Sequence, residues 1–209
     1  HTSVTESTVN ATFDIALPYT IKSNGKSNLI EIQEYELPVS YQYYTLPKKD
    51  RDAFLLSNIV GWGDYNLLPG NANIYFENTF VGESYLETAI TNDTLSVSMG
   101  RDKSIIVTRE KIKDFCKNNT LGGNRKSTRG YELKIRNNKS QAVEIEVIDQ
   151  VPLSKIKEIE VELIESKKAT YDEKTGKLTW RLKIPANSTE TVSFKFSVKY
   201  PKDKTINNL

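Results

Sequence analysis

The stretch Asn66–Asp114, NLLPGNANIYFENTFVGESYLETAITNDTLSVSMGRDKSIIVTREKIKD, indicates the fold class. Apolar and polar residues alternate along residues 72–77 and 94–99, which is the period of a strand with one buried face. Asn78-Thr79 has turn chemistry, and Gly100–Lys103 (GRDK) is predicted to form a second turn. The stretch therefore predicts a meander of antiparallel hairpins rather than alternating strands and helices.

The chain before this stretch has the same period of two. It predicts a strand at Thr12–Ile21 and a further run at Leu29–Tyr44, which Pro38 breaks in two because proline lacks a backbone donor. Ala53–Val60 fits either a short helix or a buried strand, and the turn residues GWGDYN that follow favour the strand. These patterns predict a first half built from strands.

The chain beyond Cys116 begins with a polar, glycine-rich run, residues 117–124 (KNNTLGGN), which is predicted to be a linker or a long loop. The alternation after this run is regular and predicts several strands, each with one apolar and one polar face. Short strands of this kind, separated by turns, are typical of an immunoglobulin-like sandwich. The residues predicted to face its core are Tyr131, Leu133, Ile135, Val143, Ile145, Val147, Ile159, Val161, Leu163, Leu178, Trp180, Leu182, Ile184, Val192, Phe194, Phe196, Val198 and Tyr200.

We therefore predict an all-β protein with an antiparallel β-sandwich architecture. An N-terminal β part, the strand meander, is expected to span residues 1–116, and the immunoglobulin-like sandwich is expected to span residues 125–209. A length of 209 residues fits one large all-β domain or two small ones. The first strand is compatible with either part, since a strand can cross over and join the second sheet.

Four segments carry a resemblance to a known family. They are NLLPGNANIYFENTFVGESYL (66–86), DTLSVSMGRDKSIIVTREKIKDF (93–115), YELKIRNNKSQAVEIEVIDQVPLS (131–154) and TGKLTWRLKIPANSTETVSFKFSVKYPKD (175–203). In this order and without a large gap, they resemble the C-terminal domain of unknown function of the mucoidy inhibitor A family of bacterial cell-envelope proteins. The resemblance covers about Leu46–Asp203. It implies an all-β domain, usually preceded by another β domain and a coiled coil, and it implies no catalytic residues.

The resemblance implies an exported protein, in the periplasm or at the cell surface, with a protein of the cell envelope as its expected partner. No apolar run approaches the roughly 18–20 residues that cross a bilayer, so no transmembrane segment is expected. The first residues, His1–Asn10, lack the charged start and the apolar centre of a signal peptide. The sequence opens on His1 instead of Met, so we expect this chain to be a fragment from which any targeting segment and upstream domains have been removed.

The counts of histidine and cysteine exclude several kinds of site. His1 is the single histidine and Cys116 the single cysteine, so the chain supplies no Ser-His-Asp or Cys-His arrangement, no His-ligated zinc and no internal disulfide. Packing around Trp180 must replace the disulfide of antibody domains. A pair of carboxylates is the enzymatic option that remains, although turn or strand-end roles explain each candidate, namely Asp64, Asp93, Asp102 and Asp149. We expect no enzyme, no cofactor and no metal.

Charge is distributed unevenly along the chain. Residues 1–100 carry 5 basic and 12 acidic side chains, and residues 101–136 carry 11 basic and 4 acidic ones. The basic stretch either forms an anion-binding strip or pairs with the acidic first part, and we favour pairing. In the same way, Arg101 of the GRDK sequence either contacts an anion or clamps a neighbouring carboxylate, which we favour. A formal net charge of +2 predicts no nucleic-acid partner. The candidates for contact with an anion or a partner are Arg101, Lys103, Arg125, Lys126 and Arg129.

Aromatic side chains provide a candidate ligand site. Tyr41, Tyr43 and Tyr44 form a cluster, which Trp62 and Tyr65 follow, and such rings can stack on sugars. Alternatively, Tyr41 and Tyr43 share one face of a strand and cover a core with their hydroxyls in water, and we favour this interpretation. A sugar-binding site requires two or more of these rings to be exposed and coplanar in one groove.

We predict a non-catalytic interaction or scaffolding module of an exported bacterial cell-envelope protein, of unknown activity. The first alternative is a carbohydrate-binding module that binds a glycan through exposed aromatics. The second is a carboxylate-dependent glycan hydrolase, which requires two convergent acids in a deep pocket and at least one perturbed pKa. A scaffold requires neither and should present a flat or apolar patch large enough for a partner.

Overall fold

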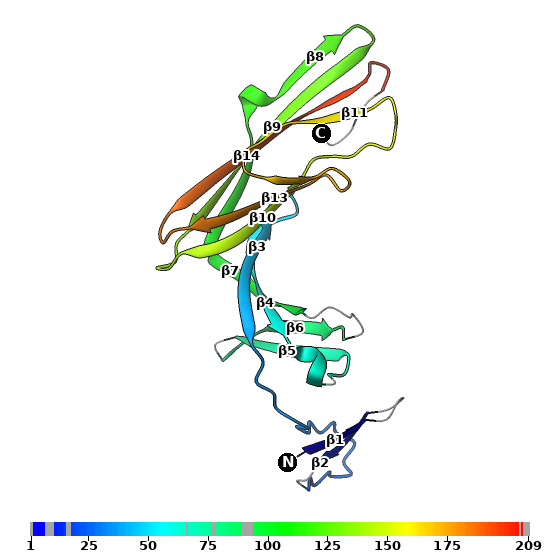
Figure 1. Ribbon diagram of the computed structural model, residues 1–209, viewed down its shortest axis with the longest axis vertical. Coiled ribbons are helices and arrows are strands. Elements are labelled where there is room, and N and C mark those ends of the chain that lie inside the picture. Colours follow the sequence, from blue (N-terminus) through cyan, green and yellow to red (C-terminus); the bar gives the residue numbers. More distant parts are fainter. Residues whose placement is uncertain are drawn as a thin grey trace.

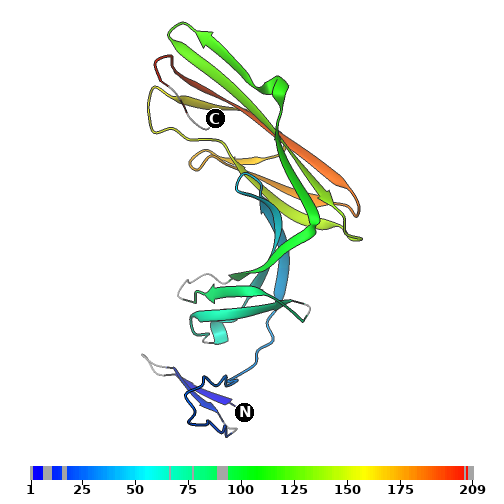
Figure 2. The ribbon, with the colours of Figure 1, turned by 180° about the vertical axis from the view of Figure 1, so that it is seen from behind.

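The computed structural model describes residues 2–6, 11–15, 18–65, 67–76, 78–88, 94–204 and 206. Figures 1 and 2 show an elongated molecule with a β-sandwich at one end, a narrow sheet below it and two small hairpins towards the N-terminus. Within the described residues, no helix has the length and apolar character needed to span a bilayer.

The secondary structure of the described residues is almost entirely β. Its two short 3-10 helices are η1 (Trp62–Tyr65) and η2 (Lys113–Phe115). Its strands are β1 (Thr2–Glu6), β2 (Ala11–Ile15), β3 (Val39–Leu46), β4 (Asp50–Val60), β5 (Gly70–Phe76), β6 (Thr79–Leu86), β7 (Thr94–Lys111), β8 (Lys117–Leu121), β9 (Asn124–Asn137), β10 (Val143–Gln150), β11 (Glu160–Ser166), β12 (Thr170–Asp172), β13 (Lys177–Ile184) and β14 (Thr189–Pro201).

One large sheet contains most of these strands. Its order is β11-β14-β9-β7-β4-β3-β10-β13-β12, with β8 added beside β9. Neighbouring strands are antiparallel except β3 and β10, which run parallel, with Tyr43 opposite Ile145. The β1–β2 and β5–β6 hairpins are separate two-stranded sheets. The early strands β3 and β4 therefore lie in the middle of a sheet that the second half of the chain completes.

The core lies where the two halves of this sheet pack face to face. Side chains from β7, β9 and β14 meet side chains from β10 and β13 in one buried cluster. Trp180 is fully buried there, with its ring centroid 6.0 Å from that of Phe194 and its indole N–H donating to the Lys167 carbonyl at 2.8 Å. The β-sandwich prediction is thereby confirmed, and its immunoglobulin-like topology stays a prediction.

The predicted core alternation is confirmed along the central strands. Most of the predicted positions are buried; the half-buried ones are Leu182, Tyr200, Val161 and Leu163 of the edge strand β11, and Ile159 just before it. An edge strand has a neighbour on one side only, so its apolar side chains keep more contact with water.

Strand β7 connects the sandwich to the narrow sheet, which is the part of the large sheet where β3, β4 and the first part of β7 extend beyond the sandwich. Its first part pairs with β4, and its second part, from Ile105, pairs with β9. The β4–β7 pairing shifts register on both sides of Phe54, and Gly100 adopts a φ of +90°, which glycine tolerates without strain. The prediction of a turn at GRDK is therefore wrong, because these residues lie within one continuous strand, at an irregularity in its pairing.

The β5–β6 hairpin packs one face against the narrow sheet. The Phe76 ring lies edge-on to the Tyr41 ring, with 5.9 Å between centroids. Phe76, Val81 and Met99 line a hollow of about 490 Å³ between the hairpin and β7. Asn78 has a φ of +61° and begins the hairpin turn, which confirms the turn predicted at Asn78-Thr79. The opposite face of the hairpin stays open to solvent.

Two strand predictions near the N-terminus are wrong in extent. The strand predicted at Thr12–Ile21 corresponds to β2, which ends at Ile15, and residues 18–21 belong to no strand. Of the run predicted at Leu29–Tyr44, the part after Pro38 is confirmed as β3, but residues 29–38 form no strand. Alternation alone cannot make a strand, because a strand also needs a neighbour that accepts its backbone hydrogen bonds.

The run predicted as a linker or a long loop, residues 117–124, forms strand β8 and a tight turn at Gly122-Gly123. Strand β8 carries polar residues on both faces, so it gives no apolar alternation in the sequence. Strands from both sides of the predicted boundary at residue 116 share the ten-stranded sheet. The division into parts 1–116 and 125–209 that fold separately stays a prediction. The strand favoured at Ala53–Val60 is confirmed as β4.

Candidate functional site

The GRDK sequence forms a clamp at the passage of β7 from the narrow sheet to the sandwich. Successive residues of a strand point to opposite faces of its sheet. Arg101 and Lys103 therefore lie on one face, and Asp102 lies on the other. Each face has its own charged partners, so this one short sequence forms ion pairs on both faces of the sheet.

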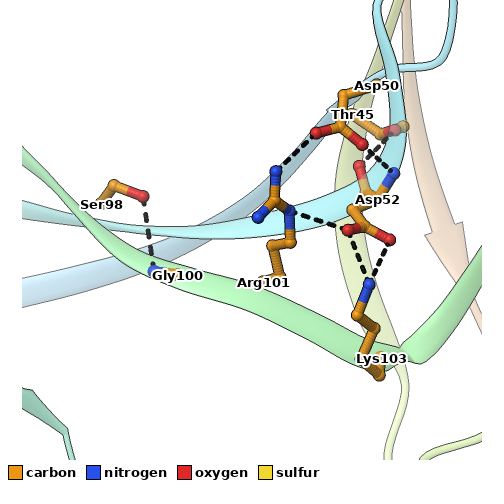
Figure 3. Close-up of polar contacts among 7 residues, drawn as sticks. All are labelled: Thr45, Asp50, Asp52, Ser98, Gly100, Arg101 and Lys103. Carbon is orange, nitrogen blue, oxygen red and sulfur yellow. Dashed lines mark hydrogen bonds and ion pairs between the residues drawn. The ribbon is translucent and has the colours of Figure 1, made fainter. Parts of the chain in front are cut away.

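On the first face, Arg101 and Lys103 of β7 bind two carboxylates of β4. Arg101 donates to Asp50 through Nη2 and contacts Asp52 through Nε, both at 2.8 Å, and Lys103 Nζ lies 2.7 Å from Asp52 (Figure 3). Hydrogen bonding from Arg101 lowers the pKa of Asp50 below its ordinary value. The clamp interpretation of Arg101 is confirmed, and the pairing of the basic stretch with the acidic first part is confirmed at these residues.

On the second face, Asp102 joins β7 to β3 and to the turn between β9 and β10. Its Oδ2 accepts hydrogen bonds from the Tyr43 hydroxyl at 2.8 Å and from Lys139 Nζ at 2.6 Å, and Lys139 also donates to the Tyr43 hydroxyl at 3.0 Å. Burial opposes ionisation of Asp102, but the hydrogen bonds from Lys139, the Ser104 backbone and Tyr43 outweigh it and lower its pKa from 3.8 to about 2. The tyrosine hydroxyl is therefore part of a charged network and is not free in water.

The low pKa of Asp102 predicts an acid-sensitive contribution to stability. A carboxylate whose pKa is lower in the folded state stabilises the fold above its unfolded pKa of 3.8, and the effect is lost as the pH falls towards 2. We expect Asp102→Asn to lower the free energy of unfolding at pH 7 by on the order of 1–2 kcal/mol, after allowance for partial solvent screening. Urea unfolding of the wild type and the variant between pH 7 and pH 2.5 measures this. A difference that stays constant over that range would contradict the assignment.

A further ion pair lies inside the sandwich, between β7 and β10. Arg109 Nε and Nη2 donate to the two carboxylate oxygens of Asp149, at 2.7 and 3.2 Å, and the Asp149 side chain is fully buried. The Arg109 guanidinium carbon lies 3.7 Å from the centroid of the Tyr131 ring, within cation–π distance. The buried carboxylate is thus compensated by a two-point hydrogen-bonded partner, which is itself covered by an aromatic ring.

The tyrosines predicted as a ligand site do not form one platform. Tyr41 is 57% exposed, but its ring is held edge-on by Phe76. Tyr43 is half-buried in the Asp102 network. Tyr44 points to the opposite face of β3 and stacks on Phe54 at 5.3 Å. Three neighbouring residues thus have three different environments.

The other two predicted aromatics lie in η1. Trp62 is 8% exposed, and its indole nitrogen has no hydrogen-bond partner among the described residues. The Tyr65 ring packs edge-on against Tyr35, with 4.6 Å between centroids. The structure therefore does not bring these two rings together with the tyrosines of β3 in an exposed, coplanar arrangement.

The remaining basic candidates lie on the β8–β9 hairpin. Lys126 pairs with Glu162 of β11 at 3.2 Å, and Arg129 donates to Asn118 of β8 at 3.1 Å. Arg125 is exposed near the turn. Two of the three candidates therefore hold strands together. No group of three or more histidine, cysteine, aspartate or glutamate side chains suited to a metal ion occurs in the part of the chain that the structure describes.

The outer face of the β5–β6 hairpin is a candidate site that the sequence analysis missed. Tyr75, Phe80 and Tyr85 are 63%, 51% and 59% exposed. Tyr75 and Phe80 are cross-strand neighbours with ring centroids 5.5 Å apart, and Tyr85 lies opposite Asn71 in the same register. The available signal was Tyr75, an aromatic residue at the polar phase of the alternation. We call this surface, made by Asn71, Asn73, Tyr75, Phe80, Glu83 and Tyr85, the aromatic face.

The chain is similar in sequence to known proteins. The family model described as Domain of unknown function (DUF4139) matches residues 2–202. A curated protein of Caenorhabditis elegans, Protein F37C4.5, is 22% identical over 219 residues, which covers 99% of this chain and 39% of the worm protein. The chain therefore spans well under half the length of that relative, and neither the family description nor the name of the relative states an activity.

Proposed function

Because the chain belongs to the family of the Domain of unknown function (DUF4139), whose description assigns no activity, we propose its function from its geometry: a non-catalytic interaction module that binds a basic protein surface. The observation that carries this proposal is the aromatic face. Solvent-exposed aromatic residues gathered on one side of a hairpin are typical of a protein-binding surface, where tyrosine and phenylalanine are enriched.

The charge of this end of the molecule selects the partner. Residues 53–100, which include the whole hairpin, contain no lysine or arginine and five acidic residues, namely Asp64, Glu77, Glu83, Glu87 and Asp93. On the aromatic face, Glu83 is exposed beside the rings. Arginine and lysine side chains bind both carboxylates and the faces of aromatic rings. A basic partner is therefore complementary to this face in charge and in chemistry.

The charged clusters elsewhere in the molecule support a non-catalytic role. Asp102 and Asp149, two of the carboxylates considered for catalysis, are each held by a cation from another element of the fold, Lys139 of the β9–β10 turn and Arg109 of β7. Their hydrogen bonds connect β7 to β3, to β10 and to the turn between β9 and β10. A hydrolytic pair would instead have two carboxyl groups directed into a common pocket at the separation that glycosidases use.

The proposal predicts binding of basic peptides through the aromatic face. We expect an array of immobilised basic, neutral and acidic peptides to retain the 209-residue chain on its basic members only, and less strongly at high salt. Phe80→Ala and Tyr85→Ala should each weaken binding at least about tenfold, which is the effect of losing an interface anchor. Biolayer interferometry on the best basic peptide measures the change.

A matched control distinguishes this face from general stickiness. Leu153 is 52% exposed, against 51% for Phe80, and lies after β10 in the sandwich. Leu153→Ala should leave binding unchanged, and circular dichroism should show all three variants folded. Equal weakening by Leu153→Ala and Phe80→Ala, or retention on acidic peptides, would overturn the assignment of the aromatic face.

The cellular location forms a further part of the proposal. The resemblance to mucoidy inhibitor A proteins supports a place in an exported cell-envelope protein, with this chain as a scaffolding part of the whole. The nematode relative does not by itself support an envelope location. Fractionation of cells that express the complete protein, followed by protease treatment of intact cells, tests this part. Recovery in the cytosolic fraction alone would refute it and would leave the binding proposal unaffected.

A further inference from the structure

A hollow of about 460 Å³ lies on the outer face of the sandwich, between the β3–β4 turn and the β12–β13 hairpin. Its apolar lining includes Leu46 of β3 and Ile148 of β10. Ile148 alternates with the buried residues Val147 and Asp149, so it points away from the core. Thr45 lies opposite Val147, and Leu46 therefore follows on the same outer face as Ile148. This apolar floor is separate from the aromatic face of the β5–β6 hairpin.

Three lysines surround the floor: Lys48, Lys49 and Lys177. The Lys48 amine lies 3.4 Å from two oxygens of Gln150, both of which are uncharged. Lys177 approaches a carboxylate, that of Glu146, at 3.8 Å, which is the long limit of an ion pair. Both contacts are weak, so these ammonium groups keep most of their capacity to bind an anion.

The two carboxylates in the lining already have partners within the protein. Asp149 is held by Arg109, at 2.7 Å. Asp172 accepts a hydrogen bond from the Thr175 hydroxyl at 2.7 Å and one from the Lys174 backbone N–H at 3.0 Å. The three lysines and two carboxylates of the lining leave the hollow with an excess of one positive charge. An anion that enters it therefore meets unneutralised ammonium groups at the rim and aliphatic side chains below them.

We propose that this hollow binds a small amphipathic carboxylate, with its charged head at the lysines and an aliphatic or aromatic body on Leu46 and Ile148. A fully hydrophilic anion would leave the apolar floor in water, and an uncharged apolar molecule would give the lysines no partner. Lysine suits this task because its ammonium group is a point charge on a flexible stem, whose methylene groups extend the apolar lining. The site is independent of the proposed protein-binding face and lies on a different part of the fold.

Three eight-carbon ligands test the proposal: octanoate, octanol and octylammonium. In ¹H–¹⁵N correlation spectra of the 209-residue chain, octanoate should shift the amides around Ile148, Gln150 and Lys177 in a saturable way. Octanol and octylammonium should bind at least about tenfold more weakly, because they lack the negative charge that the lysines require. The affinity for octanoate should fall as salt is added.

Variants locate the site. The double variant Lys48→Ala, Lys49→Ala should weaken octanoate binding at least about tenfold, and Ile148→Ser should weaken it through loss of the floor. Lys183→Ala is the matched control. Lys183 lies on the outer face of β13, the strand that contributes Lys177, but outside the lining of the hollow. Phe80→Ala should also leave octanoate binding unchanged, which separates this test from that of the aromatic face.

Several outcomes would overturn the proposal. They are equal binding of the three ligands, octanoate shifts confined to the β5–β6 hairpin, and an affinity that the lysine variants do not change. A second arm uses vesicles of anionic phospholipid to distinguish a dissolved carboxylate from a membrane surface. Sedimentation with those vesicles without any response to octanoate would show a membrane-binding surface instead and would refute the proposed ligand.

Discussion

Arg109→Met is expected to lower the free energy of unfolding by about 3–5 kcal/mol, one of the two largest effects that we predict for a single substitution. Methionine fills a similar volume beside Tyr131 but donates no hydrogen bond. The fully buried carboxylate of Asp149 then loses both contacts from the guanidinium, which the folded protein has at 2.7 and 3.2 Å. Urea denaturation at pH 7, followed by far-ultraviolet circular dichroism, measures the loss.

The double variant Arg109→Met, Asp149→Leu provides the control. Removal of both charges leaves no isolated buried ion, and we expect the double variant to regain most of the stability that Arg109→Met loses. A double variant as unstable as Arg109→Met alone would show that the loss arises from packing against Tyr131 and not from an uncompensated carboxylate. An unchanged midpoint for Arg109→Met would contradict the importance of the pair.

Trp180→Ala is expected to have a comparable effect, a loss of about 3–5 kcal/mol, since it leaves a cavity in the centre of the sandwich. Trp180 is fully buried against Phe194, and its N–H satisfies the Lys167 carbonyl. This chain has a single cysteine, so the packing around Trp180 is not supported by an internal disulfide. Chemical denaturation measured at the same pH as the wild type gives the difference.

Trp180→Phe is the matched control, because it keeps an aromatic ring and loses the indole donor. We expect it to cost about half as much as Trp180→Ala or less, from a partly filled site and one unsatisfied carbonyl. Loss of less than about 1 kcal/mol in Trp180→Ala would mean that the sandwich collapses onto the vacated space, and Trp180 would then not be central to the core.

The second half of the chain was largely predictable from its sequence. A strand with one buried face has a period of two, and the run from Leu178 to Ile184 shows that period without interruption. The same rule predicted a strand from Leu29 that does not exist before Pro38. Alternation reports which side of a strand would be buried, but it contains no information on whether another strand is available to pair with it.

The contacts that build the site were harder to predict, because they join residues far apart in the sequence. Arg101 could be recognised as a candidate clamp, but its partners Asp50 and Asp52 are defined by the register of β4 and β7. The aromatic face was difficult to predict from the sequence for another reason. Tyr75 occupies the solvent-facing phase of β5 as a single aromatic residue, whereas the tyrosines of β3 form an obvious cluster in the sequence.

The parallel pairing of β3 with β10 has a consequence for how this protein folds. Tyr43 and Ile145, which lie opposite each other, are separated by more than a hundred residues. Closing so long a loop costs chain entropy before any contact compensates for it, and folds dominated by distant pairings fold slowly, on the order of milliseconds to seconds. During synthesis, β3 can pair with β4 on one edge, but its other edge has no partner until β10 emerges. The backbone groups of that edge therefore stay unpaired for a time. In this nascent state, a chaperone or an aggregating chain competes with native folding for the edge.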